Sequence, residues 1–329
     1  MSMPASALPI TSASPDECTR EFAADVRTDL SKAQKEMHSK YLYDELGSAL
    51  FDAITHLPEY GVTRADERLL CKHARDIAGF IPEHASVIEL GSGTGRKTRH
   101  VLVALQRPDR VRRYFPIDVS HEALARCQRQ LVDVADVRPL QYSYLDGMAV
   151  AATHGFPRRE PWLVLFLGST IGNFEPERAI EFLRDLREWL IPGDMLLIGA
   201  DLVKDRKRML LAYDDPTGVT AAFNLNVLGR INRELGANFD LAKFQHEARW
   251  NETERRIEMH LRSRVDQSVF IPGADFSARF QAGETIWTES SHKFHPQEMF
   301  EIAAKTGFCV KAQWVDQEWP FVESLWMVR

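Results

Sequence analysis

The sequence predicts an α/β protein in which a parallel sheet flanked by helices carries a second, inserted lobe of α+β structure. Three observations predict this fold class. Short apolar segments alternate with amphipathic helical segments from about residue 85 to residue 201. A glycine-rich turn follows the first of these apolar segments. Within residues 255–265, apolar and polar residues alternate strictly, which indicates a half-buried strand, and further apolar runs extend it to an antiparallel sheet.

The N-terminal part of the chain is mostly helical by pattern over residues 18–80. The pattern is interrupted at LPEYGVTR, residues 57–64, where Pro58 and Gly61 predict a loop. We expect Tyr60 in this loop to face a cleft.

The parallel sheet is expected to contain five strands, at residues 86–90, 112–118, 138–144, 162–168 and 194–201. A helix is predicted over 175–190, because Pro176 suits a first helical turn. Apolar residues also recur there at spacings of three and four, at Ile180, Leu183, Leu186 and Leu190. One face of this helix should therefore pack on the sheet.

The remainder of the chain mixes helical and strand patterns. In RRIEMHLRSRV, residues 255–265, Ile257, Met259 and Leu261 alternate with polar residues, which predicts a half-buried strand. The other expected elements are helices at 205–215, 218–235 and 296–307 and strands at 276–282, 284–290 and 309–315.

These elements predict three parts. Residues 1–17, rich in serine, proline and alanine, should form a disordered tail. Residues 18–201 together with 294–329 should form the domain of the parallel sheet, and residues 202–293 the inserted lobe.

Composition excludes several classes of function. The 41 Lys and Arg residues and 47 Asp and Glu residues give a net charge of −6 without a dense basic block, so a nucleic-acid partner is not expected. The four cysteines lie far apart, which disfavours a zinc site or a disulfide framework and suits a reducing cytosol. We find neither a signal peptide nor an apolar run near the roughly 18 residues of a spanning helix, so no membrane anchor is expected.

The glycine-rich turn predicts a cofactor site. In VIELGSGTGRKTR, a strand ends at Glu89 and the turn contains Gly91, Gly93 and Gly95, which let the backbone approach a ligand at a helix N-terminus. The spacing matches neither a P-loop nor the dinucleotide turn, but is that of an S-adenosylmethionine turn. Asp118, at the end of the next strand, is placed to accept hydrogen bonds from ribose hydroxyls. The alternative is a tight turn with Asp118 as a helix cap.

The segment VLFLGSTIGNF, residues 164–174, predicts a second part of the site. Ligands of open α/β sheets bind at the carboxyl ends of the strands, and this strand ends at Gly168. Asn173 would then lie beside the reactive end of the cofactor, where its amide can hold a carboxylate and an amine together. The alternative is that Asn173 caps a loop.

With these motifs, the chain from about Lys40 to Arg329 resembles the ergothioneine-pathway histidine Nα-methyltransferases. The resemblance rests on collinear segments: LYDELGSALFDAITHLPEY, ELGSGTG, FPIDVS, FLGSTIGNF, LLAYDD, GVTAAFNLNVLGRINREL, RIEMHLRS and TESSHKF. It implies a Rossmann-like class I methyltransferase sheet with an inserted substrate-binding α+β lobe. It also implies trimethylation of the α-amino group of L-histidine to hercynine, with S-adenosyl-L-methionine as methyl donor and without a metal.

The resemblance also implies roles for individual residues. Those implied on the cofactor side are Gly91, Ser92, Gly93, Lys97 and Asp118, with Tyr144, Leu145 and Asp146 as open candidates for contacting adenine. Tyr60 and Tyr213 are implied to hold the substrate carboxylate. The catalytic Asn173 and the Gly168 carbonyl are implied to lie near the amino group, and the catalytic Tyr43 close by through water.

The same resemblance implies that Glu289 and Ser291, with Ser290 between them, bind the imidazole and that Met259 forms an apolar wall. Residues two apart on a strand share a face, so Glu289 and Ser291 can reach one ring. Without the resemblance, the core is the better interpretation of the tyrosines and Met259, and Glu289 is equally interpreted as a solvated charge. Family members commonly carry a second aromatic residue after the tyrosine in this loop, where this chain has Gly61, which predicts a looser loop or a wider cleft.

Three other hypotheses were weighed. The first is Nα-methylation of another amino acid, such as tryptophan. The second is a cofactor-binding module without activity, which would leave the substrate-side residues without a role. The third, nucleic-acid methylation, is disfavoured by the charge and by the absence of a Pro-Pro-aromatic run after Asn173. We expect a cytoplasmic monomer that acts on a small molecule.

Overall fold

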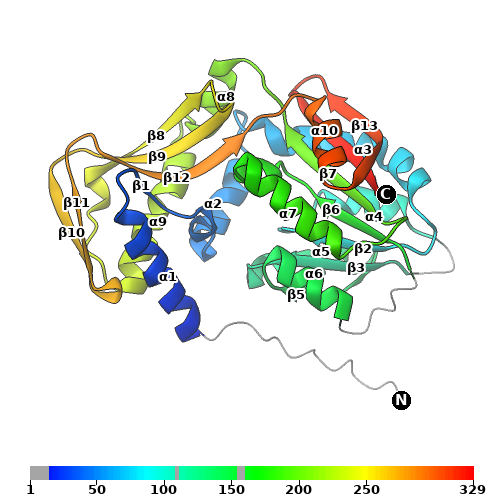
Figure 1. Ribbon diagram of the computed structural model, residues 1–329, viewed down its shortest axis with the longest axis horizontal. Helices are drawn as coiled ribbons and strands as arrows, with labels where there is room; N and C mark the ends of the chain where they lie inside the picture. Colours follow the sequence, from blue (N-terminus) through cyan, green and yellow to red (C-terminus); the bar gives the residue numbers. More distant parts are fainter. Residues whose placement is uncertain (1–14, 108–110, 154–159) are drawn as a thin grey trace.

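The computed structural model of the protein describes residues 15–107, 111–153 and 160–329 (Figure 1). Most of the expected tail therefore lies outside the described residues. Its last three residues belong to helix α1 (Pro15–Leu30), so the helical part begins earlier than predicted.

An eight-stranded sheet forms the first layer of the fold, in the order β13-β14-β7-β6-β2-β3-β4, with β5 also paired to β3. Its strands are β2 (Ser86–Leu90), β3 (Arg113–Asp118), β4 (Asp136–Val137), β5 (Leu140–Gln141), β6 (Trp162–Phe166), β7 (Met195–Asp201), β13 (Phe308–Asp316) and β14 (Phe321–Val328). β2, β3, β6 and β7 pair in parallel, whereas β14 runs antiparallel to β7 and β13. The predicted Rossmann-like sheet is confirmed.

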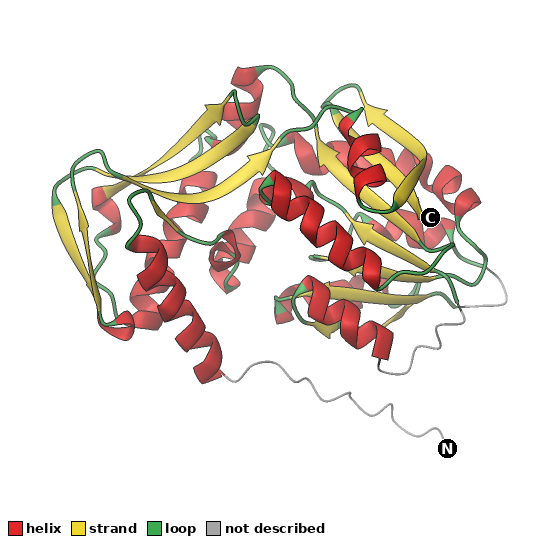
Figure 2. Ribbon diagram, viewed as in Figure 1, coloured by secondary structure: helices red, strands yellow, loops and turns green. Residues whose placement is uncertain are grey.

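Helices cover both faces of this sheet (Figure 2). One core joins the sheet to α3 (Gly61–Phe80), α4 (Thr98–Ala104) and α5 (His121–Leu131), and another joins it to α6 (Tyr144–Thr153), α7 (Pro176–Glu188) and α10 (Glu298–Lys305). The central strands are buried at every position, because successive side chains enter the two cores in turn. The strand order reverses between β2 and β6, and such a reversal opens a crevice at the carboxyl ends of the strands.

Two sequence predictions about this sheet are wrong. Of the strand expected over 138–144 only β5, residues 140 and 141, forms, because Pro139 cannot donate to the ladder and α6 already begins at Tyr144. The final strand β14 was not predicted, since nearly all its residues are buried and no alternation marks it.

The second lobe is built on a four-stranded sheet in the order β1-β12-β9-β8. Its strands are β1 (Lys35–Glu36), β8 (Phe244–Asn251), β9 (Arg256–Ser263) and β12 (Thr285–His292), beside a hairpin of β10 (Gln267–Ile271) and β11 (Phe276–Phe280). α8 (Arg206–Tyr213) and α9 (Val219–Leu235) confirm the two expected helices. Strands β8 and β10 were not predicted from the sequence.

The N-terminal segment packs on this lobe, not on the parallel sheet. β1 pairs with β12, and Phe22, Val26 and Leu30 of α1 share a core with residues of α9. α2 (Glu45–Thr55) also packs against α9 (Figure 1). We therefore propose that residues 15–55 belong to the lobe, together with the predicted 202–293.

The chain leaves the parallel sheet for the second lobe after β7 and returns after β12. These two connections lie side by side, and Leu202 of the first forms an isolated bridge with Phe294 of the second. Within the described residues, no helix is long and apolar enough to cross a membrane.

Candidate active site

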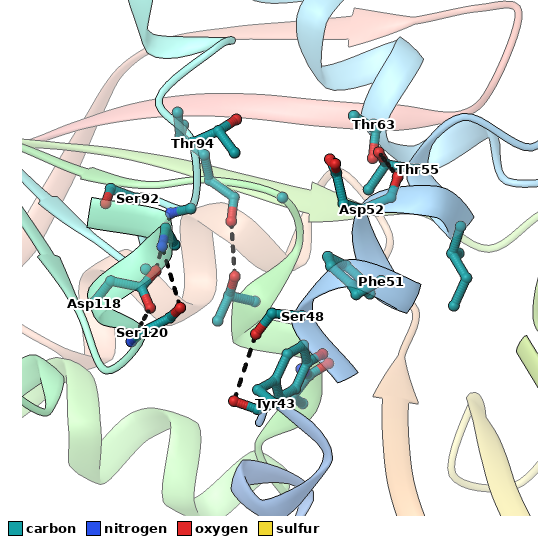
Figure 3. Close-up of a pocket in the computed structure, with 18 of the residues that line it drawn as sticks. Tyr43, Ser48, Phe51, Asp52, Thr55, Thr63, Ser92, Thr94, Asp118 and Ser120 are labelled. Carbon is teal, nitrogen blue, oxygen red and sulfur yellow. Dashed lines mark hydrogen bonds between the residues drawn. The ribbon is translucent and has the colours of Figure 1, made fainter. Parts of the chain in front are cut away.

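A cavity of about 600 Å³ lies at the carboxyl ends of the parallel strands and is also lined by residues of the second lobe. Asp118, Ser92 and Ser120 lie on one side of it, and Tyr43 and Phe51 on the other (Figure 3). The predicted site residues that line it are Tyr43, Tyr60, Gly91, Ser92, Gly93, Lys97, Asp118, Tyr144, Gly168, Asn173, Tyr213, Met259, Glu289 and Ser291. The structure thus brings residues from both layers to one cavity.

The turn after β2 exposes its backbone to this cavity. Gly91, Gly93 and Gly95 all have positive φ angles, of 72°, 52° and 72°. A Cβ on Gly95 would lie 2.7 Å from the Cys127 sulfur, whereas the same position on Gly93 faces open space. The turn therefore requires glycine for its conformation and leaves room for a ligand to approach the main chain.

Asp118 closes the cofactor side of the cavity. Its carboxylate accepts hydrogen bonds from the backbone N–H groups of Gly93, at 3.0 Å, and Ser120, at 2.9 Å. Burial raises the pKa of Asp118 above its ordinary value, although these backbone donors oppose the shift. The α5 cap is supplied by Ser120, whose hydroxyl accepts from the Ala123 N–H. The carboxylate is therefore fixed at the rim of the turn and exposed to the cavity.

A buried ionic cluster connects the helix that follows the glycine turn to the end of β6. The Lys97 ammonium forms an ion pair with Asp66, which also accepts the Gly168 N–H at 2.9 Å. Burial alone would lower the pKa of Lys97, but the carboxylates of Asp66 and Glu89 raise it overall. Lys97 thus ties the cofactor turn to the end of β6, besides lining the cavity.

Of the three adenine candidates, only Tyr144 lines the cavity, where its hydroxyl lies 3.2 Å from the Cβ position of Gly91. Leu145 packs in the core beside α7, and Asp146 accepts the Ser143 hydroxyl at 2.5 Å. The structure does not support contact of Leu145 or Asp146 with the cofactor, because α6 begins at Tyr144 and turns the next two side chains away.

The predicted carboxylate-binding tyrosines meet in the cavity. The rings of Tyr60 and Tyr213 lie 6.1 Å apart, in an edge-to-face arrangement. Each is 7% exposed and belongs to the lobe's core, so both are core residues that also line the cavity. Burial raises the pKa of Tyr60 well above its ordinary value, which keeps its hydroxyl a hydrogen-bond donor.

β12 supplies two predicted residues on one face. Glu289 and Ser291 line the cavity, and the Tyr43 hydroxyl donates to Glu289 at 3.3 Å. Ser290 does not line the cavity, because alternation along the strand turns it to the opposite face, where its hydroxyl donates to Glu175. The structure therefore does not support a substrate contact for Ser290.

The end of β6 places Asn173. Gly168 and Ser169 both have positive φ, of 74° and 61°, and the chain then enters a short 3₁₀ helix, η2 (Thr170–Asn173). A Cβ on Gly172 would lie 2.8 Å from the His292 carbonyl oxygen, so this helix packs directly on β12. The close approach puts Asn173 on the cavity wall beside the strand of Glu289.

Sequence reasoning missed the aromatic residues Phe51 and Phe223, which line the cavity. It also missed a buried charge cluster, Asp201, Lys204 and Lys293, beneath Tyr213 and Ser291. Spacing could have found Lys293, which follows Glu289 and Ser291 with the same period of two. The described residues contain no cluster of three histidine, cysteine or acidic side chains suited to a metal ion.

The class I sheet, the glycine turn, the acid after the second parallel strand and the cavity define an S-adenosylmethionine-dependent methyltransferase. The family model described as "Histidine-specific methyltransferase, SAM-dependent" matches residues 22–328, and the chain belongs to that family.

Two mycobacterial proteins are similar over almost their whole lengths. The chain is 41% identical over 310 residues to the histidine N-alpha-methyltransferase of Mycolicibacterium smegmatis, covering 94% of this chain and 96% of that one. It is 43% identical over 309 residues to the protein of that name from Mycobacterium tuberculosis, covering 92% and 93%.

Two further similarities are more distant. An L-tryptophan methyltransferase of Psilocybe serbica is 27% identical over 305 residues, covering 85% of each chain. Among solved structures, an S-adenosylmethionine-dependent methyltransferase from Clostridium acetobutylicum is similar with a TM-score of 0.41 and 11% identity, covering 78% of this chain and 92% of that one.

Proposed function

We propose that the protein methylates the α-amino nitrogen of L-histidine three times, giving hercynine, with S-adenosylmethionine as the methyl donor. One observation carries the proposal. A single cavity joins the glycine turn and Asp118 to Tyr60, Tyr213, Asn173 and Glu289. The names of the two mycobacterial relatives, histidine N-alpha-methyltransferase, support it.

The cofactor fits the side of the cavity formed by the turn. The backbone at Gly93 faces open space, and the Asp118 carboxylate is fixed beside it as an acceptor for ribose hydroxyls. Tyr144 lies against the turn at Gly91 and offers a ring for the base. When bound, S-adenosylmethionine supplies a methyl group on a positively charged sulfur, which is electrophilic without further activation.

The opposite side of the cavity holds the amino acid. The hydroxyls of Tyr60 and Tyr213 donate to its carboxylate, and Glu289 accepts a ring N–H of its imidazole. Asn173 and the Gly168 carbonyl orient the amino group toward the cofactor side. The amino acid is thus held at both ends, which aligns the nitrogen for an in-line transfer and excludes water.

The site needs no strong base. The α-amino group of free histidine is mostly protonated at neutral pH, but burial in the cavity disfavours the ammonium form and lowers its pKa. Hydroxyls, water and the Asn173 amide therefore suffice to orient the lone pair. The ammonium form loses one proton to solvent before each transfer, and the methyl donor leaves as S-adenosylhomocysteine. After the third transfer the nitrogen has no lone pair, and the reaction stops.

We also propose the cellular setting that the family resemblance implies. The reaction would serve ergothioneine biosynthesis in the cytoplasm, the protein would act as a monomer, and neither a metal nor a nucleic acid would take part. Nα-methylation of tryptophan is the second candidate, favoured by the similarity to the protein of Psilocybe serbica.

Incubation of the protein with S-adenosylmethionine and a panel of amino acids tests both candidates by mass spectrometry. We expect a mass gain of three methyl groups on L-histidine and none on L-tryptophan. A gain on tryptophan alone would replace the leading function with the second. Calorimetry that detects cofactor binding but no amino acid binding would instead favour a module without activity.

A further inference from the structure

Lys293 lies directly beneath the cavity, and its side chain is fully buried. Its ammonium donates hydrogen bonds of 2.8 Å to the Tyr213 hydroxyl and 2.8 Å to the Ser291 hydroxyl. The same nitrogen lies 3.0 Å from the Asp201 carboxylate. An ammonium has three N–H donors and no acceptor, so all three are directed at these partners.

We propose that Lys293 is a positioning residue that makes the Tyr213–Ser291 hydroxyl pair donate into the cavity and so favours substrates that carry a carboxylate. The inference deepens the proposed function and rests on it.

Counting the hydroxyl protons gives the first argument. Both hydroxyl oxygens accept from Lys293, and they lie 2.7 Å apart, so one hydroxyl donates to the other. The oxygen that accepts twice has used both its lone pairs. One hydroxyl proton remains, and both residues line the cavity, so this proton is available to a bound acceptor. The hydroxyl that donates to its neighbour keeps one lone pair, so the count provides a donor for a carboxylate oxygen and the charge of Lys293 decides the preference for it.

Charge gives the second argument. Asp201 also pairs with Lys204 at 2.5 Å, and both side chains are at most 2% exposed. Burial alone would raise the pKa of Asp201, but the two ammonium groups lower it overall. Two lysines thus share one carboxylate, which leaves a buried positive charge behind the hydroxyl pair. In a low-dielectric interior this charge attracts an anionic group more strongly than it would in water.

Glu289 lies on the same strand face and offers an acceptor for a ring N–H. The cavity is therefore polarised, with donors backed by Lys293 in one part and a carboxylate in another. This arrangement complements an amino acid that has a carboxylate and a basic ring.

The test compares two ligands that differ in the carboxylate. Binding of L-histidine and of histamine, its decarboxylated analogue, would be measured by calorimetry with S-adenosylhomocysteine present. For Lys293→Met we expect histidine affinity to fall about 10- to 100-fold, the loss typical of a hydrogen bond to a charged group, and histamine affinity to change less than about threefold. The KM for histidine should rise more than kcat falls.

Lys204→Met is the matched control. It also removes one buried ammonium beside Asp201, but Lys204 bonds to Asp201 and the Leu202 carbonyl, not to the hydroxyl pair. We expect it to lower the ratio of histidine to histamine affinity less than Lys293→Met does, because the hydroxyl pair keeps its ammonium donor. An equal loss for both ligands in Lys293→Met, or no loss, would overturn the inference.

Lys293→Gln serves if the methionine variant does not fold. It keeps an N–H donor without the charge, and we expect an intermediate affinity ratio. A ratio equal to that of the unchanged protein would overturn the role of the charge. If the unchanged protein neither binds nor methylates histidine, the proposed function fails first and the inference with it, which separates the two failures.

Discussion

Glu289 is the residue whose environment best fits recognition of an imidazole ring. Burial raises its pKa to about 7, although the Tyr43 hydroxyl and Lys293 both oppose the shift. This value lies close to the ordinary imidazole pKa of about 6.5. The carboxyl and the ring can therefore share one proton near neutral pH, which makes their hydrogen bond charge-assisted.

Replacement of Glu289 by alanine tests this role. We expect Glu289→Ala to lower kcat/KM for L-histidine by about 30-fold or more, since truncating one partner of a buried charged hydrogen bond costs about 2 kcal/mol or more. Cofactor affinity, measured by calorimetry, should not change. Ser290→Ala is the control, because Ser290 lies on the opposite strand face, and it should retain full activity. Full activity in Glu289→Ala would exclude the ring-binding role.

Glu89 gives a prediction about pH and stability. Its carboxyl is 2% exposed and accepts from the hydroxyls of Thr98 and Tyr114, and burial raises its pKa from 4.5 to about 7. Between pH 4.5 and about pH 7, Glu89 therefore binds its proton more fully in the folded protein than in the unfolded chain. The carboxyl therefore lowers the free energy of unfolding as pH rises, by up to about 3 kcal/mol once it is ionised in both states.

Glu89→Gln mimics the protonated carboxyl and removes this pH dependence. We expect the difference in free energy of unfolding between the variant and the unchanged protein to grow in favour of the variant from pH 4 to pH 8. Urea unfolding at both pH values measures the gain. Acids that do not interact with Glu89 titrate in both proteins and cancel in the comparison. Stability curves that run parallel across this range would show that Glu89 does not ionise as described.

The elements that the sequence predicted best are those with a clear period. Alternation marked β9, and the spacing of apolar residues marked α7. β14 was not predicted, because both its faces are buried and its sequence therefore lacks alternation. Even Glu323 of this strand is buried. Site residues followed the same rule. The period of two grouped Glu289 with Ser291 on one face and, if continued, reaches Lys293, but it did not show that this lysine would be buried.

Gly61 shows how packing overrides a local prediction. The sequence suggested that this glycine loosens a loop, whereas it is the first residue of α3. A Cβ there would lie 2.1 Å from the Trp319 ring, so the indole fills the space where a larger residue would stand. The Trp319 indole N–H in turn donates to Asp201 at 2.9 Å. The glycine therefore permits a contact that connects α3 to the charge cluster under the cavity.

Gly61→Ala should accordingly destabilise the protein by about 1–3 kcal/mol, as overpacking does, even though alanine favours a helix. It should also raise the KM for histidine, because Tyr60 precedes the displaced helix start. Gly79→Ala in the same helix is the control, since its Cβ would meet no atom within 4 Å. We expect that control to be neutral or stabilising by up to about 1 kcal/mol. Denaturant unfolding compares the two, and equal effects would contradict the packing argument.

At the scale of the whole molecule, the shape of the cavity depends on how the second lobe is held over the parallel sheet. The chain passes between the two layers at the Leu202–Phe294 bridge. Near the cavity mouth, Arg126 of α5 lies 3.9 Å from Asp52 of α2, an exposed pair that contributes little energy. The lobe also packs on the sheet domain where η2 meets β12, and it has a core of its own, to which α1 contributes Phe22.

Phe22→Ala tests whether α1 belongs to the substrate lobe. Phe22 is 1% exposed, its ring centroid lies 4.3 Å from that of Tyr41, and the Arg230 guanidinium lies 5.0 Å from its ring. Removing such a ring costs about 3–5 kcal/mol. Because the cofactor turn belongs to the sheet, we expect histidine binding to be lost at a lower temperature than cofactor binding.

Calorimetric titrations with each ligand over a range of temperatures measure this difference. Phe270→Ala, at a side chain that is 51% exposed, is the control and should change stability by less than about 0.5 kcal/mol. If Phe22→Ala loses both ligands at the same temperature, the lobe and the sheet unfold as one cooperative unit. In that case the histidine-binding residues of the lobe have no stability separate from the methyltransferase sheet.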